Sequence, residues 1–356
     1  MVTISLCMIV RDEEAVLARC LDSVREAVDE MVIVDTGSLD RTKEIASLYT
    51  EKVYDFPWID DFAAARNASF SRAGMDYCMW LDADDVMTKG ERDRLIAWKE
   101  QADGSADAVM MKYAAGMDEE GRETFCYYRE RLVRRDRGFR WKGRVHEAME
   151  VHGNVEYLDI RVEHRSRKKI YGDRNLKIYE RMRTEGEVLS ARDLFYYGRE
   201  LYYHGRYEEA VGCFLFFLDR KDGFLENQVE ACRFASYCLY ALGKEEKALQ
   251  YLYRGLMYRA PGGELCCDLG KHYADRRDFE QAAFWYEAAL RARRRDQGGG
   301  FVQEECYGYI PCVQLSVCYS QMGEMEKAYV CHKMAGNYKP YGREYLKNEE
   351  YFHNME

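Results

Sequence analysis

YCMWLDADD (residues 77–85) joins an apolar run to three aspartates, and this junction points to the fold of the N-terminal half. A short, continuous apolar run bounded by polar residues is typical of a strand buried on both faces, as in a parallel sheet covered by helices. Ligands of such sheets bind at the carboxyl ends of the strands. We therefore expect Asp82, Asp84 and Asp85 to lie at a binding site.

The residues before this stretch alternate between strand and helix patterns. We expect strands at 2–10, 31–35, 52–56 and 77–85, with helices at 12–28, 42–49 and 62–73. Alternating strands and helices form a mostly parallel sheet with right-handed crossovers. Arg11 and residues 35–40 should then share one edge of the sheet with the three aspartates.

Residues 107–164 follow a different pattern, which indicates further, partly antiparallel strands. These strands are expected in AVMMKY (108–113), TFCYY (124–128), RLVRR (131–135) and VEYLDIRV (155–162). The segment 129–144 is dense in arginine, and two interpretations of it stay open. It is either a solvated face or a positive wall that faces a diphosphate or an anionic acceptor.

From about residue 190 the pattern becomes helical and repeats. Each repeat has an alanine after an acidic or acidic-polar pair: Ala210, Ala248, Ala282 and Ala328. A small residue stands twelve positions earlier: Gly198, Ser236, Gly270 and Ser316. A bulkier residue stands four positions later: Phe214, Leu252, Tyr286 and His332. Turns are marked by Gly205, Gly243 and Gly323.

This pattern resembles the tetratricopeptide repeat in period and residue choice. Small residues are needed where the two helices of a pair cross closely. We expect four such helix pairs, and their stacked faces would either hold a peptide acceptor or pair two chains into a homodimer.

The composition excludes several classes of protein. A net charge of −10 argues against a chain that mainly coats nucleic acid. Thirteen cysteines with no CxxC pair favour buried thiols over disulfides or zinc sites. Apolar runs such as 211–218 are too short to cross a bilayer, and the N-terminus lacks the features of a signal peptide. We therefore expect a cytoplasmic protein without a transmembrane segment, for which peripheral membrane association stays open.

Five segments, in their order and spacing, resemble the inverting family 2 glycosyltransferases of the GT-A fold. They are ISLCMIVRDEE (4–14), VIVDTGSLDRT (32–42), DFAAARNASF (61–70), WLDADD (80–85) and WKGRVHE (141–147). The WKGRVHE segment resembles the corresponding element of one subgroup, which contains lipopolysaccharide-core sugar transferases and bacteriocin peptide S-glycosyltransferases. The latter also carry helical repeats after the catalytic domain.

The resemblance implies an α/β GT-A domain, Rossmann-like with a mostly parallel sheet, followed by an all-α repeat domain. The expected boundaries are 1–169 for the GT-A domain, 170–189 for a linker helix, 190–345 for the repeats and 346–356 for a C-terminal tail.

The resemblance also implies roles for single residues. Nucleotide-sugar contacts would come from Ile9, Val10, Arg11, Glu13, Asp35, Arg66, Asp82, Ala83 and Trp141. A Mn²⁺ or Mg²⁺ ion would be held by Asp84, with Asp82 and His164 as further metal contacts. Glu147 falls where the family keeps its catalytic base, and His146 is the alternative base or metal contact.

Each of these roles has a structural alternative. Asp35 would instead cap the turn after its strand, since Asp favours such positions. Arg66 would form a surface ion pair with Asp60 or Asp61. His164 would be a solvated residue, and Trp141 would be a core residue, although an indole also stacks well on a sugar ring.

Together these features predict a metal-dependent inverting transferase. It would move a hexose from a nucleoside diphosphate sugar, most commonly UDP-linked, to Cys, Ser or Thr of a peptide or protein. A lipid-linked or cell-surface saccharide is the alternative acceptor, and a non-catalytic repeat scaffold is the alternative of another class. A dinucleotide oxidoreductase is excluded because no GxGxxG follows the first strand.

Overall fold

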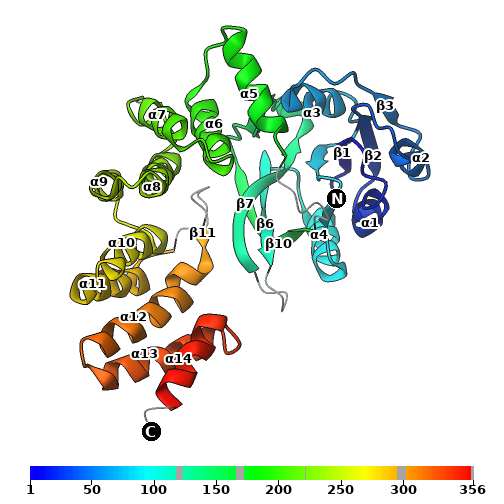
Figure 1. Cartoon of the computed structure of the whole chain (residues 1–356). Coiled ribbons are helices and arrows are strands. Elements are labelled where there is room, and N and C mark those ends of the chain that lie inside the picture. Colours follow the sequence, from blue (N-terminus) through cyan, green and yellow to red (C-terminus); the bar gives the residue numbers. More distant parts are fainter. Residues whose placement is uncertain (118–122, 166–171, 221, 295–301, 354–356) are drawn as a thin grey trace. The chain divides into compact units, whose positions relative to one another are not determined.

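The computed structural model describes residues 1–117, 123–165, 172–220, 222–294 and 302–353, and the chain divides into two compact units (Figure 1). The first unit consists of Met1–Met117 and Cys126–Val188. The second consists mainly of Leu189–Glu356. In the described residues, no helix combines the length and the apolar character that crossing a membrane requires.

The first unit is built on a mixed sheet with the strand order β3-β2-β1-β4-β7-β6-β10-β5. Its strands are β1 (Ile4–Val10), β2 (Glu30–Asp35), β3 (Val53–Asp55), β4 (Tyr77–Trp80), β5 (Asp85–Val86), β6 (Ala108–Met117), β7 (Glu123–Arg134) and β10 (Val155–His164). The strands from β3 to β4 are parallel, as expected, whereas β7 runs antiparallel to β4. A small separate sheet pairs β8 (Trp141–Lys142) with β9 (Ala148–Met149).

Helices cover both faces of this sheet, which explains why β1 and β4 are almost entirely apolar. They are α1 (Leu17–Val24), α2 (Thr42–Ser47), α3 (Phe62–Phe70) and α4 (Lys89–Gln101), and α5 (Arg174–Thr184) follows later in the chain. Leu6 and Met8 of β1 join one buried cluster with Leu21 of α1, whereas Cys7 between them joins another cluster with Phe70 of α3. A strand buried on both faces has no polar side to alternate with.

Several elements are shorter than the sequence predicted, and for two of them local polar contacts explain why. The helix expected at 12–28 begins only at Leu17, because Asp12 has a φ of 52° and accepts a hydrogen bond from Leu39 N at 2.8 Å. The strand expected at 77–85 ends at Trp80. Asp82 N then donates to Asp85 Oδ2 at 3.0 Å, and this turn starts the short strand β5. The segments 124–128 and 131–135, predicted as two strands, belong almost entirely to the one strand β7.

The second unit contains the four expected helix pairs. They are α6 (Ala191–Tyr203) with α7 (Tyr207–Leu218), α8 (Leu225–Ala241) with α9 (Glu245–Leu256), α10 (Gly263–Asp275) with α11 (Phe279–Arg291), and α12 (Tyr309–Gln321) with α13 (Met325–Tyr338). A further helix, α14 (Arg343–His353), occupies most of the expected tail.

The small residues of the repeat lie where the paired helices touch. A Cβ added at Gly198 would come within 2.7 Å of the Phe214 ring, and one added at Gly270 within 2.8 Å of the Tyr286 ring. The aromatic residue four positions after the repeat alanine therefore fills the space that the glycine leaves. This contact is the physical reason for the spacing seen in the sequence.

Candidate active site

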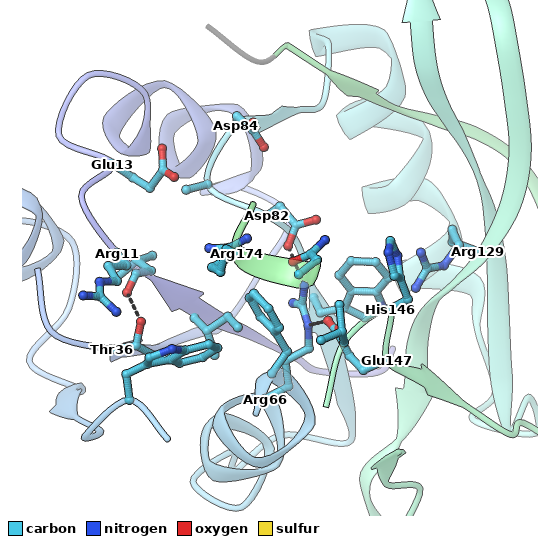
Figure 2. A pocket seen from close by; sticks show the side chains of 18 residues that line it. Arg11, Glu13, Thr36, Arg66, Asp82, Asp84, Arg129, His146, Glu147 and Arg174 are labelled. Carbon is cyan, nitrogen blue, oxygen red and sulfur yellow. Dashed lines mark hydrogen bonds and ion pairs between the residues drawn. The ribbon is translucent and has the colours of Figure 1, made fainter. Parts of the chain in front are cut away.

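A cavity of about 340 Å³ opens at the carboxyl ends of β1 and β4 in the first unit (Figure 2). Ten residues predicted from the sequence line it: Ile9, Val10, Arg11, Glu13, Arg66, Asp82, Ala83, Asp84, His146 and Glu147. The loops after β1 and β4 and the segment after β8 therefore meet at one place, although they lie far apart in the sequence.

Arg66 of α3 lies at the centre of this cavity and binds two carboxylates. Its Nε donates to Glu147 Oε1 at 2.5 Å, and its Nη2 donates to Asp82 Oδ1 at 2.7 Å (Figure 2). Nη1 is buried and makes no hydrogen bond with any residue that the structure describes. The alternative surface ion pair of Arg66 with Asp60 or Asp61 is not found. Asp60 pairs with Arg181, and Asp61 caps α3.

The charges in this group reinforce one another. Burial disfavours the charged form of Arg66, but Asp82 and Glu147 outweigh burial and raise the pKa of the guanidinium. Burial likewise opposes the ionisation of Asp82, but Arg66 outweighs it and lowers the pKa of that carboxyl. Arg66 also lies over the rings of Trp80 and Trp141, at 4.9 and 5.0 Å from their centroids. A guanidinium held between two indoles loses much of its freedom to move.

The segment 141–147 is fastened to α3, which places Glu147 beside Arg66. The side-chain amide of Asn67 accepts from Trp141 N at 3.0 Å and donates to Trp141 O at 2.9 Å. Phe62 N, at the start of α3, donates to Arg144 O at 2.9 Å. His146 has a backbone φ of 50°, a value that residues other than glycine rarely adopt. Its side chain lines the cavity.

Trp141 itself is 3% exposed and packs edge-on against Trp80, with ring centroids 5.1 Å apart. It does not line the cavity in this structure, and this placement favours its interpretation as a core residue that supports Arg66. A contact between Trp141 and a sugar stays a prediction.

Asp35 was expected either to contact the nucleotide sugar or to cap the turn after β2. Its Oδ1 accepts from the backbone N–H groups of Gly37 and Ser38, at 2.9 and 2.8 Å, and so caps the turn. Its Oδ2 is buried and has no hydrogen-bond partner in the described part of the chain. One oxygen thus holds the loop. Asp35 is buried and is not among the residues that line the cavity, and its contact with a nucleoside stays a prediction.

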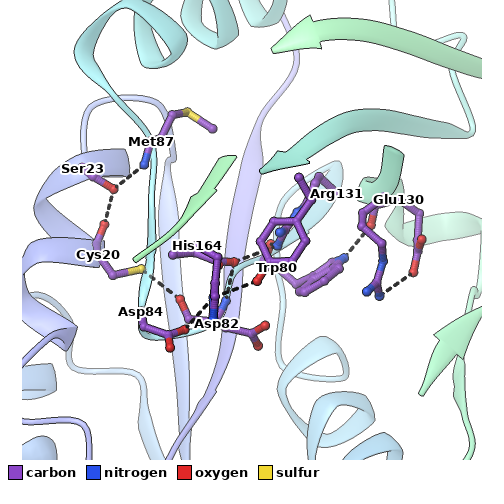
Figure 3. A network of polar contacts seen from close by, with 12 residues as sticks. Cys20, Ser23, Trp80, Asp82, Asp84, Met87, Glu130, Arg131 and His164 are labelled. Carbon is purple, nitrogen blue, oxygen red and sulfur yellow. Dashed lines mark hydrogen bonds and ion pairs between the residues drawn. The ribbon is translucent and has the colours of Figure 1, made fainter. Parts of the chain in front are cut away.

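The acidic loop after β4 is held by α1 on one side and by β10 on the other (Figure 3). Met87 N donates to Ser23 Oγ at 3.1 Å, and Cys20 Sγ lies 3.4 Å from Asp82 O. His164 ends β10, and its Nδ1 lies 3.4 Å from Asp84 Oδ1. The nearby carboxylate of Asp85 raises the pKa of His164, against the opposite effect of burial. His164 therefore lies against two carboxylates, unlike the solvated residue of the alternative interpretation.

The basic segment 129–144 separates into two groups. Most of its cations are paired with acids of the first unit: Arg131 with Asp85, Arg134 with Asp136, Arg137 with Asp107, Lys142 with Glu150, and Arg144 with Glu187. Arg129 lines the cavity and lies over the Trp80 ring at 4.8 Å. One arginine of this segment therefore reaches the cavity, together with Arg11, Arg66 and Arg174 from other elements. Four acids, Glu13, Asp82, Asp84 and Glu147, line the same cavity, so that its wall is mixed in charge rather than positive.

Sequence reasoning missed several residues of the cavity wall. They are Thr36, Trp58, Phe62, Trp80, Arg129, Val145, Arg174 and Asn175. Trp58 and Phe62 form an edge-on pair with centroids 4.8 Å apart, and Arg174 lies over Phe62 at 4.6 Å. Phe62 and Trp80 belong to motifs quoted from the sequence, but Arg174 comes from α5, where no pattern pointed to the site.

Comparison with known proteins shows that the first unit is similar to glycosyltransferases. Residues 5–151 match the family described as glycosyl transferase family 2. The SPbeta prophage-derived glycosyltransferase SunS of Bacillus subtilis is 27% identical over 229 residues, which cover 59% of this chain and 51% of SunS. The lipopolysaccharide core biosynthesis glycosyltransferase LpsC of Rhizobium meliloti is 28% identical over 168 residues, 43% of this chain and 58% of LpsC.

A third relative carries repeats in its name. The TPR repeat-containing protein Synpcc7942_0270 of Synechococcus elongatus is 47% identical over 100 residues, 28% of this chain and 23% of that protein. The chain thus spans between 23% and 58% of the length of these three relatives.

Proposed function

We propose, because residues 5–151 match the family 2 glycosyltransferases, that the protein transfers a hexose from a nucleoside diphosphate sugar, most simply a UDP-hexose, to Cys, Ser or Thr of a peptide or protein. The transfer depends on a divalent metal and inverts the anomeric configuration. The observation that supports this most directly is the convergence of Asp82, Asp84, Arg66 and Glu147 on one cavity.

In this proposal Glu147 is the general base. Its carboxylate takes the proton from the acceptor thiol or hydroxyl, which attacks the anomeric carbon. A bond from the acceptor sulfur or oxygen to that carbon forms as the bond from the carbon to the diphosphate oxygen breaks. Attack from the face opposite the diphosphate inverts the configuration. Arg66 holds Glu147 in place, and the side chain of Glu147 is 11% exposed, so that little water competes for the proton.

The donor would bind against the loops after β1 and β2. Ile9, Val10, Arg11, Glu13 and Ala83 line the cavity there. The unpartnered Oδ2 of Asp35 and the unpartnered Nη1 of Arg66 are further groups for the nucleoside and the diphosphate. Buried polar atoms without partners are rare in folded proteins, and a ligand would satisfy both.

A divalent ion would stabilise the negative charge that develops on the departing diphosphate. Asp84 and His164 fit such an ion, since a carboxylate oxygen and an imidazole nitrogen lie 3.4 Å apart at the edge of the cavity. Mn²⁺ and Mg²⁺ both accept carboxylate ligands.

Two observations favour a peptide acceptor. The WKGRVHE element is similar to that of the bacteriocin peptide S-glycosyltransferases, and the chain carries four helix pairs of the kind that form peptide-binding surfaces. The name of LpsC supports the second candidate, a saccharide acceptor. The four arginines of the cavity wall would suit a phosphorylated glycan.

The first experiment is calorimetry of the purified chain with a panel of nucleotide sugars, with and without Mn²⁺. Metal-dependent binding of one donor, with slow hydrolysis of that donor, is the expected result. A chain that binds none of the donors would contradict the proposal and favour a non-catalytic repeat scaffold.

A further inference from the structure

We propose that the second carboxylate ligand of the metal ion is Asp85, so that the ion is held by Asp84, Asp85 and His164, whereas Asp82 serves the donor side of the cavity through Arg66. This inference rests on the proposed glycosyltransferase function and specifies its metal site. It differs from the assignment expected from the sequence, in which Asp84 holds the ion with His164 and Asp82 as further metal contacts, and in which Asp85 has no role.

Asp82 is already engaged elsewhere. Its Oδ1 accepts from Arg66 Nη2 at 2.7 Å, and its side chain is 37% exposed and lines the cavity. Figure 2 shows Asp82 beside Arg66, with Asp84 further away on the same loop. Within the described residues, the group whose ligand atoms all lie within 4.8 Å of one another is Asp84, Asp85 and His164, without Asp82.

Asp85 is fully buried and uses only one of its two oxygens. Oδ2 accepts from Asp82 N at 3.0 Å and from Arg131 Nη1 at 3.1 Å. Oδ1 makes no hydrogen bond with the described residues, and it lies 3.5 Å from His164 Nδ1. Buried polar atoms without a hydrogen-bond partner are rare in folded proteins, so that this oxygen is a candidate ligand atom.

The backbone brings the three ligands together. β5 and β10 pair antiparallel, and the register sets His164 opposite Asp85. Arg165 N, directly after β10, also donates to Asp84 O at 2.9 Å, and this hydrogen bond holds Asp84 beside the end of β10. This backbone pairing therefore places the three side chains near one another.

The distances from His164 Nδ1 to the two carboxylates exceed those of a hydrogen bond and fit two ligands of one ion, although the same nitrogen also lies within hydrogen-bond distance of Tyr113 Oη. Nδ1 of His164 lies 3.4 Å from Asp84 Oδ1 and 3.5 Å from Asp85 Oδ1. An N–H···O bond is about 2.7–3.2 Å long. Two ligands that each lie about 2.2 Å from one ion are separated by roughly 3–3.5 Å. The side chains of Asp84 and His164 are 20% and 32% exposed, and they give an ion access to the buried Asp85.

Arg131 keeps Asp85 in this position. Its guanidinium is fully buried and donates to Trp80 O at 3.2 Å (Figure 3). It also contacts the rings of Trp80 and Tyr113, at 4.0 and 4.6 Å from their centroids. Tyr113 Oη in turn lies 2.9 Å from His164 Nδ1. The donor set of two carboxylates and one imidazole favours Mn²⁺ over Mg²⁺, which prefers oxygen ligands alone.

The test is a titration of the full chain with Mn²⁺ alone, in which the loss of the free-ion signal is followed by electron paramagnetic resonance. We expect Asp85→Asn to weaken Mn²⁺ binding about tenfold or more, as loss of a metal contact does. Asp84→Asn should weaken it too, and Asp82→Asn, the matched control on the same loop, should bind close to wild type.

Two results would overturn the assignment: loss of Mn²⁺ binding in Asp82→Asn with wild-type binding in Asp85→Asn, or no Mn²⁺ binding by the wild type without nucleotide. Circular dichroism shows whether Asp85→Asn folds. If it does not, the double variant Asp85→Asn with Arg131→Met removes both buried charges and takes its place. Donor hydrolysis by the wild type is measured separately, so that an error in the ligand set is distinguishable from an error in the proposed function.

Discussion

Arg66 links the proposed general base, Glu147, to Asp82 on the donor side of the cavity. One guanidinium binds Asp82, on the loop after β4, and Glu147, on the segment after β8. A carboxylate that accepts a hydrogen bond from an arginine is held in place, which suits a base that must face an incoming acceptor.

Replacing Glu147 by Gln tests the base. We expect the variant to bind the donor as the wild type does, since the amide keeps the shape of the side chain. Transfer to the acceptor should fall by about 10²–10⁴-fold, the usual contribution of a general base. Calorimetry measures the first quantity and a transfer assay the second. Wild-type turnover in Glu147→Gln would assign the base elsewhere, with His146 the next candidate in the cavity.

Replacing Arg66 by Lys tests whether catalysis needs Arg66 to hold Asp82 and Glu147 together. A lysine keeps the charge but cannot donate in two directions from one planar group, so that Asp82 and Glu147 are no longer held together. We expect kcat to fall by at least about tenfold with a smaller change in KM, because the donor contacts of the loops after β1 and β2 remain. Arg72→Lys, at an exposed position just after α3, is the matched control. Equal losses in both variants would show a general effect on α3.

At the scale of elements, the repeats are built on one contact that recurs. Gly198→Ala would bring a methyl group against the Phe214 ring, where the available distance is 2.7 Å. We expect the variant to lose about 1–3 kcal/mol of stability, as overpacked cores do. Gly212→Ala is the control, since nothing lies within 4 Å of a Cβ there and alanine favours a helix interior. Urea unfolding followed by circular dichroism compares them, and an unchanged Gly198→Ala would contradict this account of the spacing.

The turn between paired helices supplies a second test. Gly205, Gly243 and Gly323 have φ near 70–79° at the equivalent turn position of three repeats, and the third repeat has Arg277 there with a φ of 61°. Only glycine adopts this region without cost. We therefore expect Arg277→Gly to stabilise the second unit by about 0.5–1 kcal/mol, and Gly243→Ala to destabilise it by a similar amount. Thermal unfolding measures both, and a loss of stability in Arg277→Gly would show that the arginine side chain contributes more than its backbone costs.

These elements also show what the sequence can and cannot reveal. The four helix pairs were predictable because the contact between Gly198 and Phe214 leaves a fixed spacing in the chain. The ends of α1 and β4 were not, because they depend on hydrogen bonds between loops, such as that between Asp12 and Leu39. A polar contact of this kind carries no period that a sequence pattern could display.

The same limit applies to the site. Asp82, Asp84 and Glu147 were recognisable because they belong to short motifs with a family resemblance. The basic segment could not be divided into Arg129, which lines the cavity, and Arg131, which pairs with Asp85, because only the strand β7 and its neighbours decide where each guanidinium points. Arg174 enters the cavity from α5, and its position depends wholly on tertiary structure.

At the scale of the molecule, the two units have separate hydrophobic cores. The clusters around Leu6 and Cys7 belong to the first unit, and those around Leu252 and Tyr286 to the second. Damage to one core should therefore leave the other largely intact, since packing is felt mainly by direct neighbours. The proposed function adds that the first unit holds the donor and the chemistry, whereas the second presents the acceptor.

A variant of the second unit separates these roles. Gly198→Leu places a larger side chain against Phe214 and should loosen the first helix pair. We expect the variant to keep Mn²⁺ binding and slow donor hydrolysis, because the residues of the cavity lie in the first unit. Transfer to a peptide acceptor should fall much more than hydrolysis does, whereas transfer to a free saccharide should not. Parallel assays of hydrolysis and transfer, with light scattering for the oligomeric state, distinguish the outcomes. Equal transfer to the peptide in variant and wild type would remove acceptor docking from the repeats, and a lost dimer would assign them to self-association instead.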